Sequence, residues 1–225
     1  MNSESNTDFA DYAHIKSECK LHPYQRIKED FMEGGGIRSF YDLQEFLAAD
    51  KWALGIKRKH PHVFCDYIWK FEIALRKHEY YVNCHPRNVK RFYWGWRHQK
   101  LGIKLGFEIP CNVFDKGLRI NHYGLIVVNP KCRIGSFCDI HQGVNIGVGT
   151  DKQVPEIGDN VYVAPGVKIF GGITIGDNVM IGANAVVTKS FPDDVVIMGI
   201  PAEIKKYQKN IYSRAKDWND LNSID

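Results

Sequence analysis

Two histidines, His122 and His141, are the side chains in this sequence best suited to proton transfer. Histidine has an ordinary pKa near neutral pH, so it is the most frequent general base in enzymes. His122 stands in the stretch RINHYGLIVVN, where a rhythm of aliphatic residues further along the chain predicts isoleucine or valine. A histidine packed for structural reasons would fit the same position. The elements around His122 must therefore decide between a catalytic and a structural role.

The rhythm is a hexapeptide repeat. Isoleucine or valine recurs at every sixth position from residue 128 to 146 and again from 157 to 187. A helix repeats every 3.6 residues and a strand every two, so neither explains this spacing. A parallel β-helix does, because each hexapeptide forms one flat face with its aliphatic residue inside and Gly, Asn or Asp at the corner. Three faces complete a coil of about eighteen residues, and coils stack about 4.8 Å apart.

The repeat is interrupted once, between Ile146 and Ile157, which are eleven residues apart. The residues between them are polar and include glycine and proline, so we expect a loop over 147–156 that leaves the coil. Such loops on a rigid scaffold often carry function, although a harmless bulge would give the same spacing. His122 and His141 are nineteen residues apart, so we expect them near the same edge on adjacent coils.

The segments on either side of the repeat have helical periodicity. The capping pattern Ser39-x-x-Asp42 begins the first of the helices expected over residues 39–106. The stretch 90–100 mixes basic and aromatic residues. Such a mixture is found in surfaces that bind nucleic acid, but we favour a helix with an aromatic face in the core and a basic face in solvent. Beyond Pro201 an apolar stripe predicts a final helix. The stripe consists of Ile204, Tyr207, Ile211, Ala215 and Trp218.

These patterns divide the chain into three parts. Residues 1–106 are expected to form a helical N-terminal domain in which 1–20 are mobile. Residues 107–201 are expected to form the β-helix, and 202–225 a C-terminal helix. The expected fold class is therefore mainly β, with an α-helical region before the β-helix and one helix after it.

Bulk composition excludes several classes of protein. The 225 residues are 44% hydrophobic with a net charge of +4, which is ordinary for a globular chain and does not call for a nucleic-acid partner. The sequence has no apolar run long enough to span a bilayer and no secretory signal, so we expect a cytoplasmic protein without membrane insertion. Its six scattered cysteines are expected to be reduced thiols.

Two stretches carry a resemblance to a known family. Residues 117–147, GLRINHYGLIVVNPKCRIGSFCDIHQGVNIG, are similar to the serine acetyltransferase branch of the left-handed β-helix hexapeptide acetyltransferases. Residues 181–204, IGANAVVTKSFPDDVVIMGIPAEI, are similar to the acetyl-CoA end shared by the larger family. Within the branch, the sequence most resembles proteins associated with bacterial surface polysaccharides. The resemblance implies a left-handed β-helix, a homotrimer or a dimer of trimers, and acetyl-CoA in a groove between neighbouring β-helices.

The resemblance also implies roles for individual residues. His122 matches the catalytic histidine, which removes the proton of the acceptor hydroxyl, while Glu108 and Asn121 fall at or beside supporting aspartates of the family. His141 and Asp50 are candidates for contacting the acceptor, although His141 could also be only a corner residue. No metal is expected. The residues expected to border acetyl-CoA are Gly171, Gly172, Ala183, Thr188, Lys189 and Lys205.

Departures from the family pattern bear on the acceptor. The Arg-His pair that helps to hold the amino acid is Gln153-Val154 here, which removes a carboxylate clamp and a hydrogen-bonding ring. Phe107 stands where the family has an aspartate. We therefore expect an acetyl-CoA-dependent O-acetyltransferase acting on a sugar hydroxyl of a surface polysaccharide or its precursor, with free L-serine as the alternative acceptor. A γ-type carbonic anhydrase or a non-catalytic scaffold would also use a β-helix of this kind.

Overall fold

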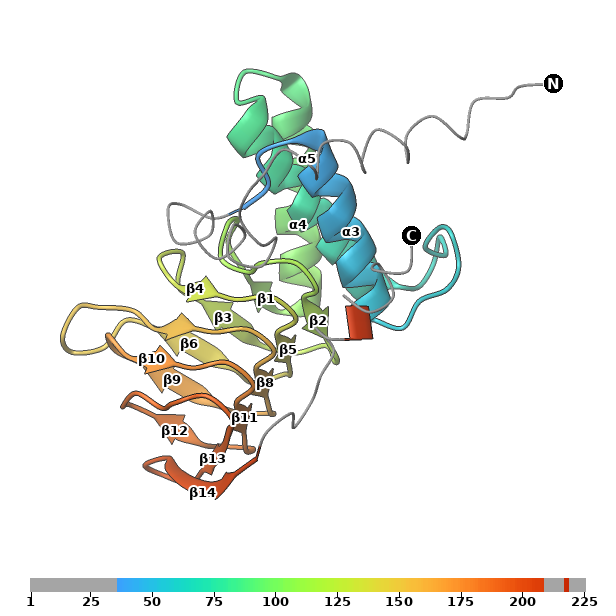
Figure 1. The fold of residues 1–225 in the computed structure, drawn as a ribbon. Helices are drawn as coiled ribbons and strands as arrows, with labels where there is room; N and C mark the ends of the chain where they lie inside the picture. The colour runs from blue at the N-terminus through green and yellow to red at the C-terminus, as the bar shows by residue number, and fades with distance from the viewer. Residues whose placement is uncertain (1–35, 209–216, 219–225) are drawn as a thin grey trace, which may run out of the picture. The chain divides into compact units, whose positions relative to one another are not determined.

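Three helices precede the coils in the computed structural model, which describes residues 36–208 and 217–218 (Figure 1). The helices are α3 (Phe40–Ala53), α4 (Tyr67–Cys84) and α5 (Val89–Leu105). The predicted cap of α3 is confirmed, because the Ser39 hydroxyl accepts a hydrogen bond from the Asp42 N–H. Asn88 caps α5 in the same way, and Gly106 ends it in a left-handed conformation that favours glycine. In the described residues, no helix is long and apolar enough to cross a membrane.

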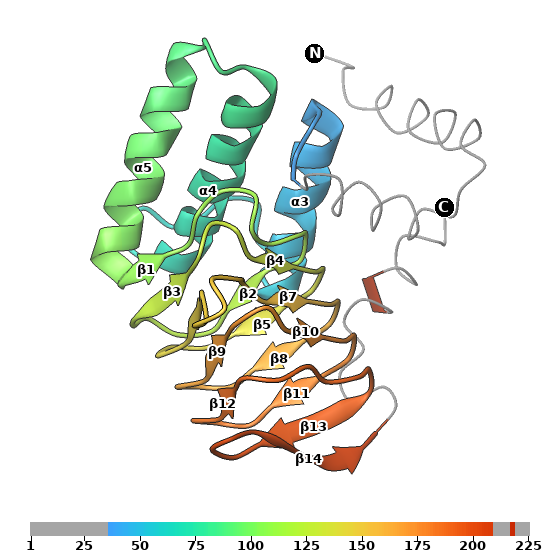
Figure 2. The same ribbon diagram turned by 90° about the vertical axis from the view of Figure 1, so that its left-hand side faces the viewer.

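Short parallel strands follow, stacked in three sheets that form a β-solenoid (Figures 1 and 2). Sheet A has the order β1-β3-β6-β9-β12, sheet B the order β10-β7-β4, and sheet C the order β14-β13-β11-β8-β5-β2. The strands are β1 (Phe107–Glu108), β2 (Arg119–Ile120), β3 (Ile126–Val128), β4 (Arg133–Ile134), β5 (Asp139–Ile140), β6 (Asn145–Gly147), β7 (Glu156–Ile157), β8 (Tyr162–Val163), β9 (Lys168–Phe170), β10 (Thr174–Ile175), β11 (Met180–Ile181), β12 (Val186–Val187), β13 (Val195–Met198) and β14 (Glu203–Tyr207). The predicted β-helix is confirmed as a solenoid; its left-handedness stays a prediction.

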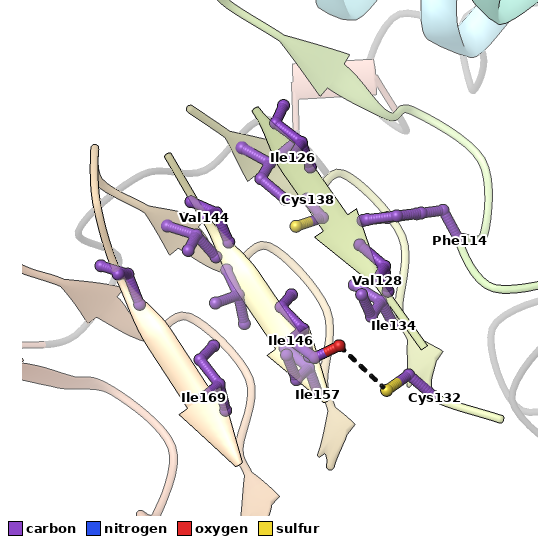
Figure 3. Packing of buried hydrophobic residues seen from close by; sticks show 14 of the residues in the cluster. Phe114, Ile126, Val128, Cys132, Ile134, Cys138, Val144, Ile146, Ile157 and Ile169 are labelled. Carbon is purple, nitrogen blue, oxygen red and sulfur yellow. Dashed lines mark hydrogen bonds between the residues drawn. The ribbon is translucent and has the colours of Figure 1, made fainter. Parts of the chain in front are cut away.

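The interior of the solenoid is a ladder of aliphatic side chains (Figure 3). Ile134, Ile146 and Ile169 have no exposed surface, as the hexapeptide frame predicts. Each such side chain stabilises the fold by about 1.5–3 kcal/mol relative to an exposed one. Cys132 and Cys138 occupy small inward positions in the same ladder, and the Cys132 thiol lies 4.0 Å from the Ile146 carbonyl oxygen.

Coil length changes along the solenoid. Val128 pairs with Ile146 eighteen residues later, but Ile120 pairs with Ile140 twenty residues later. The inward residue on that rung is therefore Ile120, and His122 follows it at the corner. The hexapeptide frame extended backwards gives an inward position at residue 122, but two additional residues in the first coil carry His122 outside the ladder, as expected if the rhythm is broken to keep this side chain at the surface.

The helices and the coils belong to one compact unit and meet in a buried ionic cluster. The Arg76 side chain on α4 has no exposed surface and donates to the Asp50 carboxylate at 2.7 Å and to the Glu79 carboxylate at 3.0 Å. Its remaining N–H groups donate to the carbonyl oxygens of Phe114, at 2.8 Å, and Asp115, at 2.7 Å. One guanidinium therefore joins two helices to the first coil.

The end of the chain differs from the helix that we expected over 202–225. Ile204 and Tyr207 lie in β14, which pairs antiparallel with β13 at the last edge of sheet C. The strand forms because the edge of β13 offers unpaired backbone groups, which local helical periodicity does not take into account. Ile211 and Ala215 lie outside the described residues. Residues 217–218 are helical, and the Trp218 ring lies 5.6 Å from that of Trp52.

Candidate active site

The two histidines lie on adjacent coils at the corner that leads from sheet C to sheet A. Pairing of β2 with β5 sets this arrangement, and the Asn121 N–H donates to the Ile140 carbonyl at 3.2 Å. The His122 and His141 rings have centroids 5.8 Å apart. His122 is exposed and His141 is half-buried, so the expectation that they share one edge is confirmed. An exposed imidazole on a rigid corner can exchange a proton with a bound molecule.

A polar network lies beside the histidine pair. The Asn121 side-chain amide donates to the Asp139 carboxylate and lies 3.1 Å from Nε2 of His141. Arg119 donates to the other oxygen of Asp139 at 2.8 Å. The Asp139 side chain is almost fully buried, and it adds a negative charge beside the His141 ring, whose Nε2 lies 3.6 Å from the carboxylate.

Sequence analysis missed Asp139. The signal was present, since Asp139 and His141 flank the inward Ile140 and therefore both point out of the coil. Arg119 and Asn121 flank Ile120 in the same way one rung earlier. The network can be recognised only if the rungs of Ile120 and Ile140 are known to be neighbours. The first coil is two residues longer than three hexapeptides, so the hexapeptide spacing does not show this.

Glu108 lies apart from this network. It is exposed at the end of β1 in sheet A, where its strand pairs with β3. Within the part of the chain that the structure describes, no hydrogen bond joins the Glu108 carboxylate to the His122 ring. Asn121 and its neighbours in sheet C contact His141, whose ring lies beside that of His122, while roles for Asn121 and Glu108 in catalysis stay predictions.

Asp50 lies in a buried setting, and its expected contact with the acceptor stays a prediction. Its side chain is almost fully buried and is held by Arg76 on one side. On the other side one carboxylate oxygen accepts hydrogen bonds from the backbone N–H groups of Gly117 and Leu118, at 2.8 and 2.9 Å. The residue is part of the joint between α3 and the first coil.

The predicted loop leaves the solenoid at the corner from sheet A to sheet B, between β6 and β7. Its Asp151 carboxylate accepts hydrogen bonds from the N–H groups of Gln153, at 3.0 Å, and Gly172, at 2.7 Å. The bond from Gly172 and that from Gln153 hold the pKa of Asp151 below its usual range. A Cβ on Gly172 would lie 2.8 Å from the Gln153 Cβ, so a larger residue here would require this part of the loop to shift. Val154 instead packs against the core.

The residues expected at acetyl-CoA fall at two corners and one end of the solenoid. Gly171 and Gly172 share the loop corner with Thr188 and Lys189 one coil later, because β9 pairs with β12. Ala183 is exposed at the other corner of sheet A, in the same column as His122 and His141. Lys205 lies on β14 and pairs with Glu203 at 3.0 Å. These residues therefore do not form one site within a single copy of the chain.

Buried thiols are poorly suited to covalent chemistry here. Burial raises the pKa of Cys132 to about 11 and raises the pKa of Cys138 and of Cys111 further still. A thiol is nucleophilic only as the thiolate, so at neutral pH these three side chains are inert as acyl carriers. The arrangement fits proton transfer by histidine better than an acyl-cysteine.

Comparisons with known proteins agree with this fold. The bacterial transferase hexapeptide (six repeats) family matches residues 155–189. The chain is 36% identical to a serine acetyltransferase of Staphylococcus xylosus over 161 residues, which cover 68% of this chain and 69% of the relative. A serine acetyltransferase of Staphylococcus epidermidis is 41% identical over 121 residues, covering 52% of this chain and 56% of the relative.

Solved structures show the same architecture. A serine acetyltransferase in complex with CoA aligns with a TM-score of 0.59 at 23% identity, covering 82% of this chain and 79% of that one. The repeat, the family match and the serine acetyltransferase relatives together define an acyltransferase of the hexapeptide-repeat β-helix class. Within this class, the extent of the Staphylococcus xylosus match is decisive. The chain belongs to the serine acetyltransferase family.

Proposed function

We propose that this chain transfers the acetyl group of acetyl-CoA to a hydroxyl group, with His122 as the general base. The observation that carries the proposal is the exposed His122 ring, held on a rigid corner beside His141. The imidazole takes the hydroxyl proton as the oxygen attacks the thioester carbonyl. The carbon–sulfur bond then breaks, and the leaving CoA thiolate takes the proton from the imidazolium.

In this proposal Asp139 is a positioning residue. It holds the Asn121 amide, and Asn121 in turn contacts His141, so the corner on which His122 sits is tied down on both rungs. A fixed base is worth more than a mobile one, because a displacement of about 1 Å can cost roughly a hundredfold in rate. Asn121 thus contributes to geometry, and Asp139 supplies the negative charge that Asn121 lacks.

The complete site would be shared between copies of the chain. His122 and the glycine corner at Gly171 flank sheet A on opposite sides, and three strand residues span about 10 Å. Side-by-side packing of copies would place the histidine corner of one beside the loop corner of the next, with acetyl-CoA between them. Tyr123, Leu125 and Val148 are 59%, 64% and 49% exposed at these corners and would be covered in such a homotrimer or dimer of trimers.

Transfer would be direct, within a complex that holds both substrates. The buried thiols of the solenoid have raised pKa values, which speaks against an acetyl-cysteine intermediate. Proximity of the two bound substrates then supplies much of the rate enhancement. A γ-type carbonic anhydrase would need three histidines around zinc, whereas the corner described above offers two.

L-serine is the acceptor that the relatives favour, since the matched proteins are named serine acetyltransferases. From the sequence we expected a surface-polysaccharide sugar, with L-serine as the alternative, and the names of the matched relatives support that alternative. One observation still favours a sugar hydroxyl: Gln153 and Val154 replace the family pair that helps to hold the amino acid, and Val154 packs into the core. Both acceptors use the same chemistry at His122.

The test is thiol release from acetyl-CoA by the full chain, with L-serine in one arm and sugar or nucleotide-sugar acceptors in the other. Turnover on L-serine supports the proposed acceptor, and turnover only on a sugar moves the assignment to the second candidate. His122→Ala should lower kcat by roughly 10²–10⁴-fold and leave the Kd for acetyl-CoA nearly unchanged. The matched control is His60→Ala, which removes an exposed histidine far along the chain from the corner.

Three results would contradict the proposal. A His122→Ala variant with near-full rate would remove His122 from the reaction. An acetylated enzyme isolated after mixing with acetyl-CoA alone would replace direct transfer with a covalent intermediate. Acetyl-CoA binding in a thermal-shift measurement, with no release in any arm, would favour a non-catalytic scaffold.

A further inference from the structure

Three side chains with metal-binding atoms converge where α4 and α5 meet the first coil. They are His78 on α4, His98 on α5 and Cys111 just after β1, and each is partly buried. The Nδ1 atoms of His78 and His98 lie 3.2 Å apart, and the Cys111 sulfur lies 3.2 Å from the same His78 nitrogen. All three ligand atoms lie within 4.8 Å of one another.

These separations are close to those around a tetrahedral metal ion. Zinc binds imidazole nitrogen at about 2.0–2.1 Å and thiolate sulfur at about 2.3 Å, which sets neighbouring ligand atoms about 3.3–3.6 Å apart. The cluster thus needs movements of only a few tenths of an ångström on two of its three sides. Without a metal, Nδ1 of His78 would have to be the hydrogen-bond partner of both the His98 ring and the Cys111 thiol.

The surroundings hold both rings in place. His98 also hydrogen-bonds the backbone at Ile109, and the Phe71 ring lies 5.1 Å from it. A Cβ on Gly95 of α5 would lie 3.0 Å from Nε2 of His78, so glycine lets the two helices approach closely at this point. Metal-binding histidines in proteins are usually oriented by such a contact on the far side of the ring.

We propose that His78, His98 and Cys111 bind one divalent transition-metal ion of the Zn²⁺ type, with a fourth position open to solvent. Binding of the ion releases the Cys111 proton, and two imidazoles with the resulting thiolate select such ions over Mg²⁺ and Ca²⁺, which take oxygen ligands. The ion would link α4, α5 and the start of the solenoid, so its role would be structural. No metal was expected from the sequence, in which these three ligands are twenty and thirteen residues apart and form no compact motif.

The experiment uses the full chain, stripped with a chelator and titrated with Co²⁺ and then Zn²⁺. We expect one equivalent of Co²⁺ to give a tetrahedral visible spectrum with a thiolate-to-cobalt charge-transfer band, which Zn²⁺ displaces. We also expect metal to raise the Tm, since an ion that binds only the folded chain stabilises it. Cys111→Ser should lose the charge-transfer band, and the control Cys65→Ser, which removes an exposed thiol, should keep it.

A second variant guards against misfolding of Cys111→Ser. His98→Gln keeps the thiol but removes one nitrogen ligand, so the band should weaken or shift and the affinity should fall at least about tenfold; circular dichroism confirms the fold of each variant. No charge-transfer band in the unsubstituted chain would overturn the inference. So would an unchanged band in folded Cys111→Ser, because the thiolate would then lie elsewhere in the chain.

Discussion

Arg76→Met tests whether one buried guanidinium holds the helices on the solenoid. The natural side chain donates to the carboxylates of Asp50 and Glu79 and to the carbonyl oxygens of Phe114 and Asp115. Methionine fills much of the same volume but donates no hydrogen bond. The variant therefore leaves two buried carboxylates without their positively charged partner and two carbonyl groups without the guanidinium donor, while Asp50 and Glu79 keep their backbone N–H donors and the loss of packing is small.

The expected cost is about 3–5 kcal/mol of unfolding free energy at pH 7, the usual penalty for removing one partner of a buried ion pair. For a chain of this size that corresponds to a Tm about 6–20 °C lower. Burial already raises the pKa of Asp50 and of Glu79, and Arg76 opposes that shift. Without Arg76 the folded chain binds protons more readily than the unfolded chain, so the penalty should grow as pH rises.

Urea unfolding followed by circular dichroism measures this penalty at pH 5.5 and pH 7, at one fixed protein concentration. Arg87→Met is the matched control, because Arg87 is exposed and should tolerate the same substitution within about 0.5 kcal/mol. A penalty for Arg76→Met below about 1 kcal/mol would refute the argument. A penalty equal at both pH values would show that the carboxylates do not take up protons when their partner is removed.

Two further predictions concern Asp115 and Asn121. Burial raises the pKa of Asp115 to about 6. The contribution of the protonated carboxyl to the free energy of unfolding is therefore fully present below about pH 4 and is lost as the pH rises through about 6. Asp115→Asn should therefore gain up to about 3 kcal/mol relative to the natural chain between pH 4 and pH 7, measured as unfolding free energy; parallel pH curves would contradict this. Asn121→Ala removes the contacts with Asp139 and His141 and should lower kcat by about ten- to a hundredfold at unchanged acetyl-CoA affinity. Full activity in that variant would show that the network does not position the base.

The ladder of the solenoid could be predicted from sequence because its period is set by local corner geometry. Ile134, Ile146 and Ile169 follow from spacing alone, and all three are buried. The frame failed where coil length changes, as between Ile120 and Ile140. A change of two residues within a coil leaves no local mark, since only strand pairing shows which residue faces inward.

Features that depend on neighbouring coils or helices were harder to predict. Asp139 became visible only when β5 was placed beside β2, and Cys111 only when the end of β1 was placed beside His78. The apolar stripe that contains Ile204 and Tyr207 has helical spacing. These residues nevertheless form a strand, because they pair with the open edge of β13. Long-range pairing thus overrode local periodicity at the site and at the end of the solenoid.

The antiparallel strand β14 has a consequence for assembly. A stack of parallel coils ends in a row of unpaired backbone groups, which is a template for another chain to add a further rung. Here the last rung reverses direction and presents the exposed, charged Lys205 and Lys206 at the edge of sheet C. A further chain adding at this edge would meet a strand of reversed direction with exposed charged side chains, which disfavours growth at this edge of sheet C. Association is thereby left to the flat faces and corners, where the proposed shared site lies.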